Sequence, residues 1–247
     1  MRLGLSAVLF VALGYVIVFA WYPDFFFETD GGWQGLRIIA AVDLVVGPLL
    51  TLIVFKAGKP GLRFDLTAIG IVQAVCLAAG LWIVHAERPI AMVFVDGQFF
   101  SLSADDFEEA GIAVPELDAF PGPEPKWVMV EIPHEPEAQS EIRTQMLRSR
   151  VPLRLAVDRY VAFDPTVIAA TEPAAYQRGA SAPVTTTGGA GARFYPFGSR
   201  YVYGLIGLET RTGRVIGVVN PAKPTTTEVG GAAALGLRST SPDAPPA

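Results

Sequence analysis

The sequence has few of the side chains on which most enzymes and metal sites depend. Its 247 residues include one cysteine, Cys76, and two histidines, His85 and His134. A single cysteine excludes an internal disulfide, and two distant histidines do not form a metal-binding pattern. The sequence also lacks a Gly-rich phosphate loop and a nucleophile elbow. We therefore predict that the protein is not an enzyme and uses no cofactor and no metal.

Basic side chains are also scarce. Lysine and arginine together number 19, against 24 aspartates and glutamates, which gives a formal net charge of -5. Residues 1–85 hold as many acidic as basic side chains, so the negative excess lies in the rest of the chain. A protein that binds nucleic acid needs a basic face to neutralise phosphates. The composition therefore argues against a nucleic-acid partner.

Long apolar runs are abundant, and three of them lie within residues 1–85. They cover residues 3–22, 38–55 and 66–84. About 20 apolar residues in a helix cross the hydrocarbon core of a lipid bilayer. Trp21 and Tyr22 end the first run with side chains that suit the headgroup layer. We therefore predict a membrane protein whose residues 1–85 form a domain of three transmembrane helices.

The charges between these runs predict the orientation of the chain in the membrane. The link between the second and third runs is basic, with Lys56, Lys59 and Arg63, whereas three carboxylates lie within residues 24–30. The positive-inside rule places the N-terminus in the cytoplasm and the C-terminal domain in the periplasm, across a bacterial inner membrane. Alternatively, the first run is a signal peptide. Its cleavage would leave the large domain on the same side.

Residues 86–223 have the pattern of a small α+β extramembrane domain, which begins with a hairpin at residues 90–103. Asp96 and Gly97 suit its two-residue turn. Pairing Val95 with Gln98 leaves both faces of this ribbon apolar, so other elements must cover each face. Ser103 followed by Asp106 predicts the start of a short helix.

The rest of this domain has weaker signals. Residues 127–132 predict another strand, and residues 135–148 place apolar side chains on one face of a helix. A second hairpin is predicted from residues 200–209 and 214–219. Together these elements predict antiparallel hairpins with about five strands. Residues 224–247 have the composition of a disordered tail.

Two polar side chains stand inside the predicted spans. An ionised Asp43 at that depth costs at least about 2.5 to 3.5 kcal/mol, so it should face protein or water. Tyr15 lies at a matching depth, which allows a hydrogen bond between them. Pro48 removes a backbone hydrogen bond and Gly47 permits close approach, so a kink there would shape a groove. Either these residues pack the spans together, or they contact a partner.

Several segments resemble one known family. The string from Asp43 through Gly47 and Pro48 to residue 55 is similar to the type IV pilin accessory protein family, as are Gln73 and the exit segment at residues 88–89. Residues 194–213 resemble it more loosely. The resemblance implies an inner-membrane accessory protein or chaperone that assists pilin stability and pilus assembly.

The same resemblance implies a partner, the type IV major pilin. Such a pilin waits in the membrane as one apolar helix that bears an acidic residue, with a globular head outside. We expect the first two predicted spans, kinked at Gly47 and Pro48, to pack against that helix while the exported domain contacts the head.

Two other classes stay open. A membrane sensor would bind a ligand outside, but the predicted cytoplasmic parts include no output domain. A small transporter-like protein would use Asp43, which has no second acidic or histidine partner in the spans.

Overall fold

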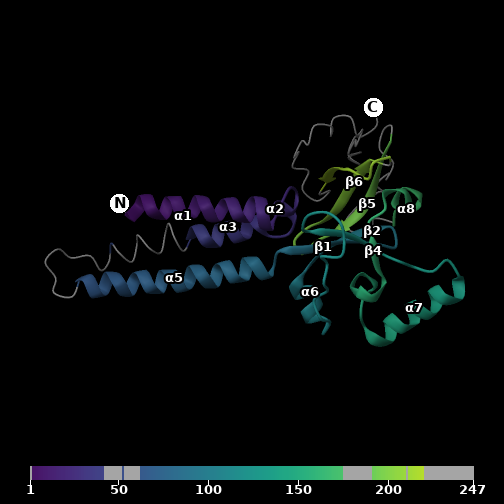
Figure 1. The fold of residues 1–247 in the computed structure, drawn as a ribbon, viewed down its shortest axis with the longest axis horizontal. Coiled ribbons are helices and arrows are strands. Elements are labelled where there is room, and N and C mark those ends of the chain that lie inside the picture. Colours follow the sequence, from purple (N-terminus) through teal and green to yellow (C-terminus); the bar gives the residue numbers. More distant parts are fainter. Residues whose placement is uncertain (1, 42–51, 53–61, 175–190, 210, 220–247) are drawn as a thin grey trace, which may run out of the picture.

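The structure is a computed structural model that describes residues 2–41, 52, 62–174, 191–209 and 211–219. It has an elongated helical part at one end and a sheet at the other (Figure 1). The chain passes from the helical part into the sheet at residues 86–89, where the last helix of the helical part ends and the first strand begins.

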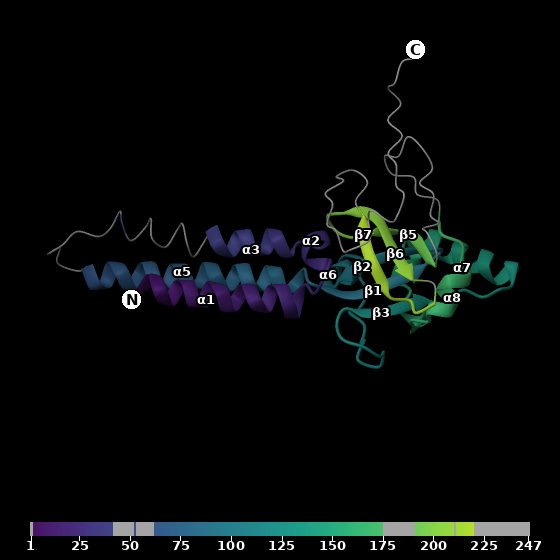
Figure 2. The same ribbon diagram turned by 90° about the horizontal axis from the view of Figure 1, so that it is seen from above.

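The helical part begins with α1 (Arg2–Val16), which continues into a π-helical turn, η1 (Ile17–Trp21). A short helix, α2 (Phe26–Thr29), and α3 (Gly32–Ala40) follow. The long helix α5 (Leu62–Ala86) leads to the sheet. Helices α1, α3 and α5 lie side by side along the length of the molecule (Figures 1 and 2).

The predicted fold class, three transmembrane helices followed by a small α+β domain, is wrong. Among the described residues, only Thr67–Ala86 form a helix that is long and apolar enough to cross a membrane. The first run contributes only a shorter apolar stretch, Phe10–Trp21, within the helix formed by α1 and η1. Its end is also buried in protein, since Ile17 and Tyr22 are almost fully covered. Most of the second run, residues 42–51 and 53–55, lies outside the described residues.

Within the described residues, the sheet has seven strands in the order β4-β3-β1-β2-β5-β6-β7. The strands are β1 (Pro89–Val95), β2 (Gln98–Ser103), β3 (Lys126–Val130), β4 (Tyr160–Ala162), β5 (Ala192–Gly198), β6 (Tyr203–Glu209) and β7 (Val215–Val219). Two neighbouring pairs are parallel, β1 with β3 and β2 with β5. The sheet is therefore larger than predicted and mixed, not built from antiparallel hairpins alone.

The first hairpin has the predicted register. Val95 pairs with Gln98, and Phe94 pairs with Phe99. Asp96 and Gly97 both have positive φ, 49° and 74°, as a two-residue turn of the type I′ kind requires. The second hairpin, β6 with β7, is also confirmed.

The two predicted helices of this domain are present as well. Helix α6 (Ala104–Glu109) starts with a capping box in which Ser103 and Asp106 bond reciprocally. Asp106 Oδ2 accepts from the Ser103 backbone N–H at 2.7 Å. Helix α7 (Pro136–Ser149) is amphipathic and buries Ile142. A third helix, α8 (Pro165–Ala170), follows β4.

Alternation along the strands divides the core into two clusters, as the apolar ribbon faces require. On one face, Val93, Val95 and Val128 pack with Phe107 of α6. On the other, Met92, Phe94, Phe99 and Met129 join a cluster that extends into the helical part. That second cluster includes Ile17, Tyr22, Phe26, Ile39 and Val84, so the sheet and the helices share one core.

Candidate functional site

The ends of the apolar helices are fastened to each other where they reach the sheet. Tyr22, which follows η1, donates a hydrogen bond from its hydroxyl to the Val84 carbonyl oxygen of α5 at 2.8 Å. Helix α3 approaches α5 closely, because a Cβ on Gly35 would lie 2.8 and 2.9 Å from the two Val84 methyl carbons. Gly35 therefore permits a helix contact that a larger side chain would prevent.

The same end of the helical part is fastened to the sheet. The Phe25 ring meets Phe197 of β5 edge to face, with centroids 5.9 Å apart. The Ser199 hydroxyl donates to the Thr29 carbonyl oxygen at 2.6 Å. Arg200 Nε lies 2.7 Å from Glu87 Oε2. We call the region formed by residues 22–35, 84–88 and 197–202 the helix–sheet junction.

A buried carboxylate lies in this junction. Asp30 is only 4% exposed, and its Oδ2 accepts a hydrogen bond from the Thr29 hydroxyl at 2.6 Å. Burial raises the pKa of Asp30 from 3.8 to about 6, although the Ser101 and Thr29 hydroxyls act in the opposite direction. The negative charge of nearby Asp106 raises the pKa further. Asp30 therefore changes charge close to physiological pH.

Beside the junction the surface opens into a groove of about 1020 Å³. We call it the aromatic groove, because Phe19, Phe25, Phe27, Trp33, Trp127 and Tyr201 line it. Four consecutive residues of β7, Val215 to Val218, form one wall. Typical small-ligand sites have volumes of about 300 to 1000 Å³ and mostly apolar walls. This groove has the size and the lining to receive a segment of a polypeptide.

The charges along the groove have one sign. Asp24, Glu28 and Glu124 line it, and no lysine, arginine or histidine is among its described lining residues. Cations do flank it: the Arg37 guanidinium lies 5.0 Å from the centre of the Trp33 ring, and Arg88 approaches Glu124 at 3.8 Å. The Trp33 ring thus already attracts a cation in this protein.

The two predicted site residues that the structure describes, Tyr15 and Gln73, do not line the aromatic groove. Tyr15 is 65% exposed and stacks obliquely on Phe19, and Gln73 is half-buried on α5. Asp43, Gly47 and Pro48 lie outside the described residues. The contact between Tyr15 and Asp43, the kink, and the choice between internal packing and partner contact all stay predictions.

Sequence reasoning missed the groove because its walls come from distant segments. One local signal was available: residues 25–27 are three consecutive phenylalanines, followed by Trp33, in a link that otherwise separates two apolar runs. Aromatic side chains gathered in a surface segment commonly mark an interaction site.

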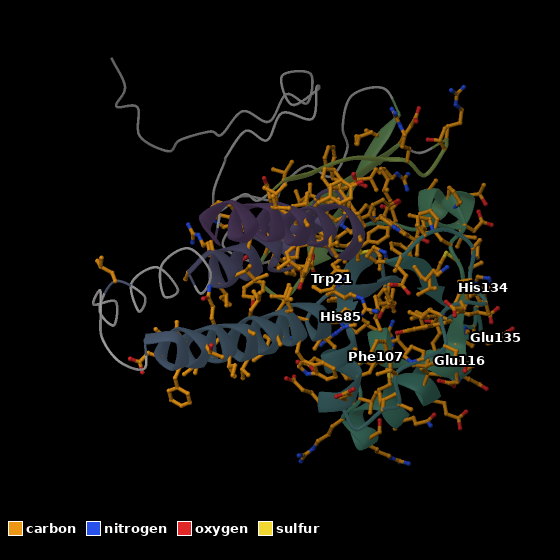
Figure 3. All side chains as sticks on the ribbon, turned by 60° about the vertical axis from the view of Figure 1, so that its left-hand side comes forward. Trp21, His85, Phe107, Glu116, His134 and Glu135 are labelled. Atoms are coloured by element: carbon orange, nitrogen blue, oxygen red, sulfur yellow. The ribbon has the colours of Figure 1, made fainter. Side chains whose placement is uncertain are left out.

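The two histidines lie apart, as Figure 3 shows. His85 packs edge to face against Trp21 at the helix–sheet junction, with centroids 5.0 Å apart. His134 lies with Glu135 at the opposite end of the sheet part. In the part of the chain that the structure describes, no group of three histidine, cysteine or acidic side chains is arranged to hold a metal ion.

Comparison with known proteins identifies relatives from Dichelobacter nodosus. Over 121 residues the chain is 31% identical to the fimbrial assembly protein of serogroup E1 and 30% identical to that of serogroup I. Each of these alignments covers 47% of this chain and 47% of the relative. It is 29% identical over 92 residues to the fimbrial assembly protein of serogroups C1 and C2, 36% of this chain and 70% of that relative. The chain thus spans about half the length of the first two relatives it matches.

No protein-family model and no solved structure matches the chain. The names of the relatives nevertheless confirm the resemblance noted from sequence, since they are consistent with a type IV pilus-associated family. These names describe the relatives as proteins of fimbrial assembly.

Proposed function

We propose that this chain is an inner-membrane accessory protein, or chaperone, that assists type IV pilin stability and pilus assembly by holding a pilin at the membrane boundary. The observation that carries the proposal is the similarity to three proteins named fimbrial assembly proteins. The aromatic groove, which lies where the apolar helices meet the sheet, is the site that we assign to this role.

The exposed apolar surface of α5 supports a membrane location. Only 11% of its most apolar stretch is buried, and Ile71, Val72, Val75 and Trp82 are each more than half exposed. Such a continuous apolar surface is unfavourable in water and stable in lipid. We place α5 across the bacterial inner membrane and the sheet on the periplasmic side.

This placement gives the aromatic groove a function. A pilin subunit awaiting assembly stays in the same membrane, so its membrane-proximal residues pass at the depth of the groove. An accessory protein that covers them would prevent aggregation or degradation of the subunit until a pilus takes it up. The hydrogen bond from Tyr22 to the Val84 carbonyl ties this part of the protein to α5, and the contact of Phe25 with Phe197 ties it to β5.

Deletion of the gene in its native host tests the proposal. Major pilin in the inner membrane and pili sheared from the surface are quantified in the same cells, and reintroduction of the gene serves as the control. We expect loss of surface pili, with pilin depleted if the protein protects the subunit and retained if it promotes polymerisation. Unchanged pilin and unchanged pili would refute the assembly function.

A further inference from the structure

We infer that the outer edge of β7 and the aromatic groove together bind an extended, apolar segment of the partner that carries a basic residue, and that this segment joins the sheet as an added strand. For the identity of the partner, the inference rests on the proposed pilin-binding function. The binding mode rests on three features of the groove.

The first feature is the position of β7. It is the last strand in the order of the sheet and pairs with β6 on one side only. No described strand pairs with its outer edge. A strand in that position presents a row of backbone N–H and C=O groups that can bind another extended chain.

The second feature is how β7 meets the groove. Successive side chains of a strand point to opposite faces, so a groove over one face would contact only every second residue. Here Val215, Ile216, Gly217 and Val218 all line it. The groove therefore reaches residues of both faces of β7, and a strand added along β7 would place alternate side chains against its aromatic wall.

The third feature is charge. Asp24 and Glu124 line the groove, which has no basic residue among its described lining positions. A lysine or arginine in the bound segment would be attracted both by these carboxylates and by the neighbouring aromatic rings. An anionic lipid headgroup would be repelled, and an acyl chain would leave the backbone groups of β7 without partners. The chemistry therefore favours a basic, apolar polypeptide over a lipid.

Photocrosslinking in piliated cells tests the inference with the full-length chain. Benzoylphenylalanine replaces Ile216 at the groove, or Val167, which is 46% exposed on α8 and serves as the matched control. We expect a covalent adduct with the major pilin from position 216 and none from position 167. Mass spectrometry should map the adduct to an apolar pilin segment that contains lysine or arginine.

Charge reversal tests the electrostatic part. Asp24→Lys with Glu124→Lys should lower the adduct yield about fivefold or more, because like charges now face the basic segment. The control pair, Glu116→Lys with Asp118→Lys, changes charge equally at exposed positions outside the groove and should leave the yield unchanged. Equal yields in the two double variants would contradict the predicted charge of the ligand.

Hydrogen exchange tests the strand addition. With purified pilin added to the detergent-solubilised chain, the amide groups of β7 should exchange about tenfold more slowly, while those of α7 should not change. Unchanged exchange in β7 would overturn this binding mode.

The remaining outcomes separate this inference from the proposed function. If gene deletion abolishes pili but position 216 forms no adduct with pilin, the docking inference is wrong and the assembly function stands. An adduct only with lipid, or only with a second copy of this chain, also overturns it. If deletion leaves pili unchanged, the assembly function fails and the inferred partner fails with it.

Discussion

At the scale of single residues, Asp30 has the most unusual environment among the described carboxylates. It is buried between the helices and the sheet, with the Thr29 hydroxyl as hydrogen-bond donor, and its pKa is raised to about 6. The folded chain therefore binds this proton more tightly than the unfolded chain does. The stability that Asp30 contributes is fully present below pH 3.8 and is lost as the pH rises through about 6.

Asp30→Asn should remove this pH dependence. When the pH is lowered from 7.5 to 5, the free energy of unfolding of the wild type should rise by about 1 kcal/mol relative to that of the variant. This corresponds to about 2 to 4 °C in thermal midpoint. The measurement is thermal unfolding of the detergent-solubilised full chain at both pH values. Asp118→Asn, at an exposed position, is the control and should follow the wild type. Parallel pH profiles for wild type and Asp30→Asn would refute the assignment.

At the scale of secondary-structure elements, the contact between α3 and α5 depends on one glycine. A methyl group on Gly35 would meet the Val84 side chain, and the Val84 carbonyl also binds Tyr22. Helix α3 and the segment after η1 therefore both meet the same turn of α5. A change that separates α3 from α5 should disturb the base of the helix–sheet junction as well.

Gly35→Ala should destabilise the protein by about 1 to 3 kcal/mol, because the added methyl overpacks the contact with Val84. Gly70→Ala is the matched control, since no described atom lies within 4 Å of a Cβ built there. It should be neutral or stabilise the helix by up to about 1 kcal/mol. Thermal unfolding in detergent measures both, and equal effects of the two substitutions would contradict the inferred close packing.

At the scale of the whole molecule, apolar and polar surfaces are segregated along the long axis. Helices α1 and α5, which carry exposed apolar side chains, lie at one end of the molecule, and α7, whose sequence is rich in charged residues, lies at the other (Figure 1). The aromatic groove lies between them. This arrangement suits a protein that is held in a membrane at one end and acts at the membrane surface.

Membrane attachment through α5 predicts that the wild-type chain stays with the membrane fraction after an alkaline wash. Val72→Arg with Val75→Arg should release it, because each arginine in the hydrocarbon core costs about 2.5 to 3.5 kcal/mol. Both valines are more than half exposed on α5. Val167→Arg on α8 is the control and should leave fractionation unchanged. Release of the wild type by the wash would contradict a spanning α5.

Short-range interactions made part of this structure predictable from sequence. The turn at Asp96 and Gly97 needs two adjacent residues that tolerate positive φ, and the cap of α6 needs Ser103 three residues before Asp106. Strand alternation then specifies the register of the first hairpin, because a shift by one residue would exchange its faces. The family resemblance was also accessible from local strings of residues.

The sequence by itself therefore determined the hairpins, the capped helices, the exposed apolar helix and the assembly-protein resemblance, whereas only the tertiary structure decided the sheet and the site. Parallel pairs such as β2 with β5 join segments about a hundred residues apart, through connections that carry no local signal. The burial of Asp30 and the aromatic groove arise where those segments meet the helices. Neighbouring residues specify turns and caps, but a carboxylate acquires its pKa, and a groove its walls, from residues that folding brings together.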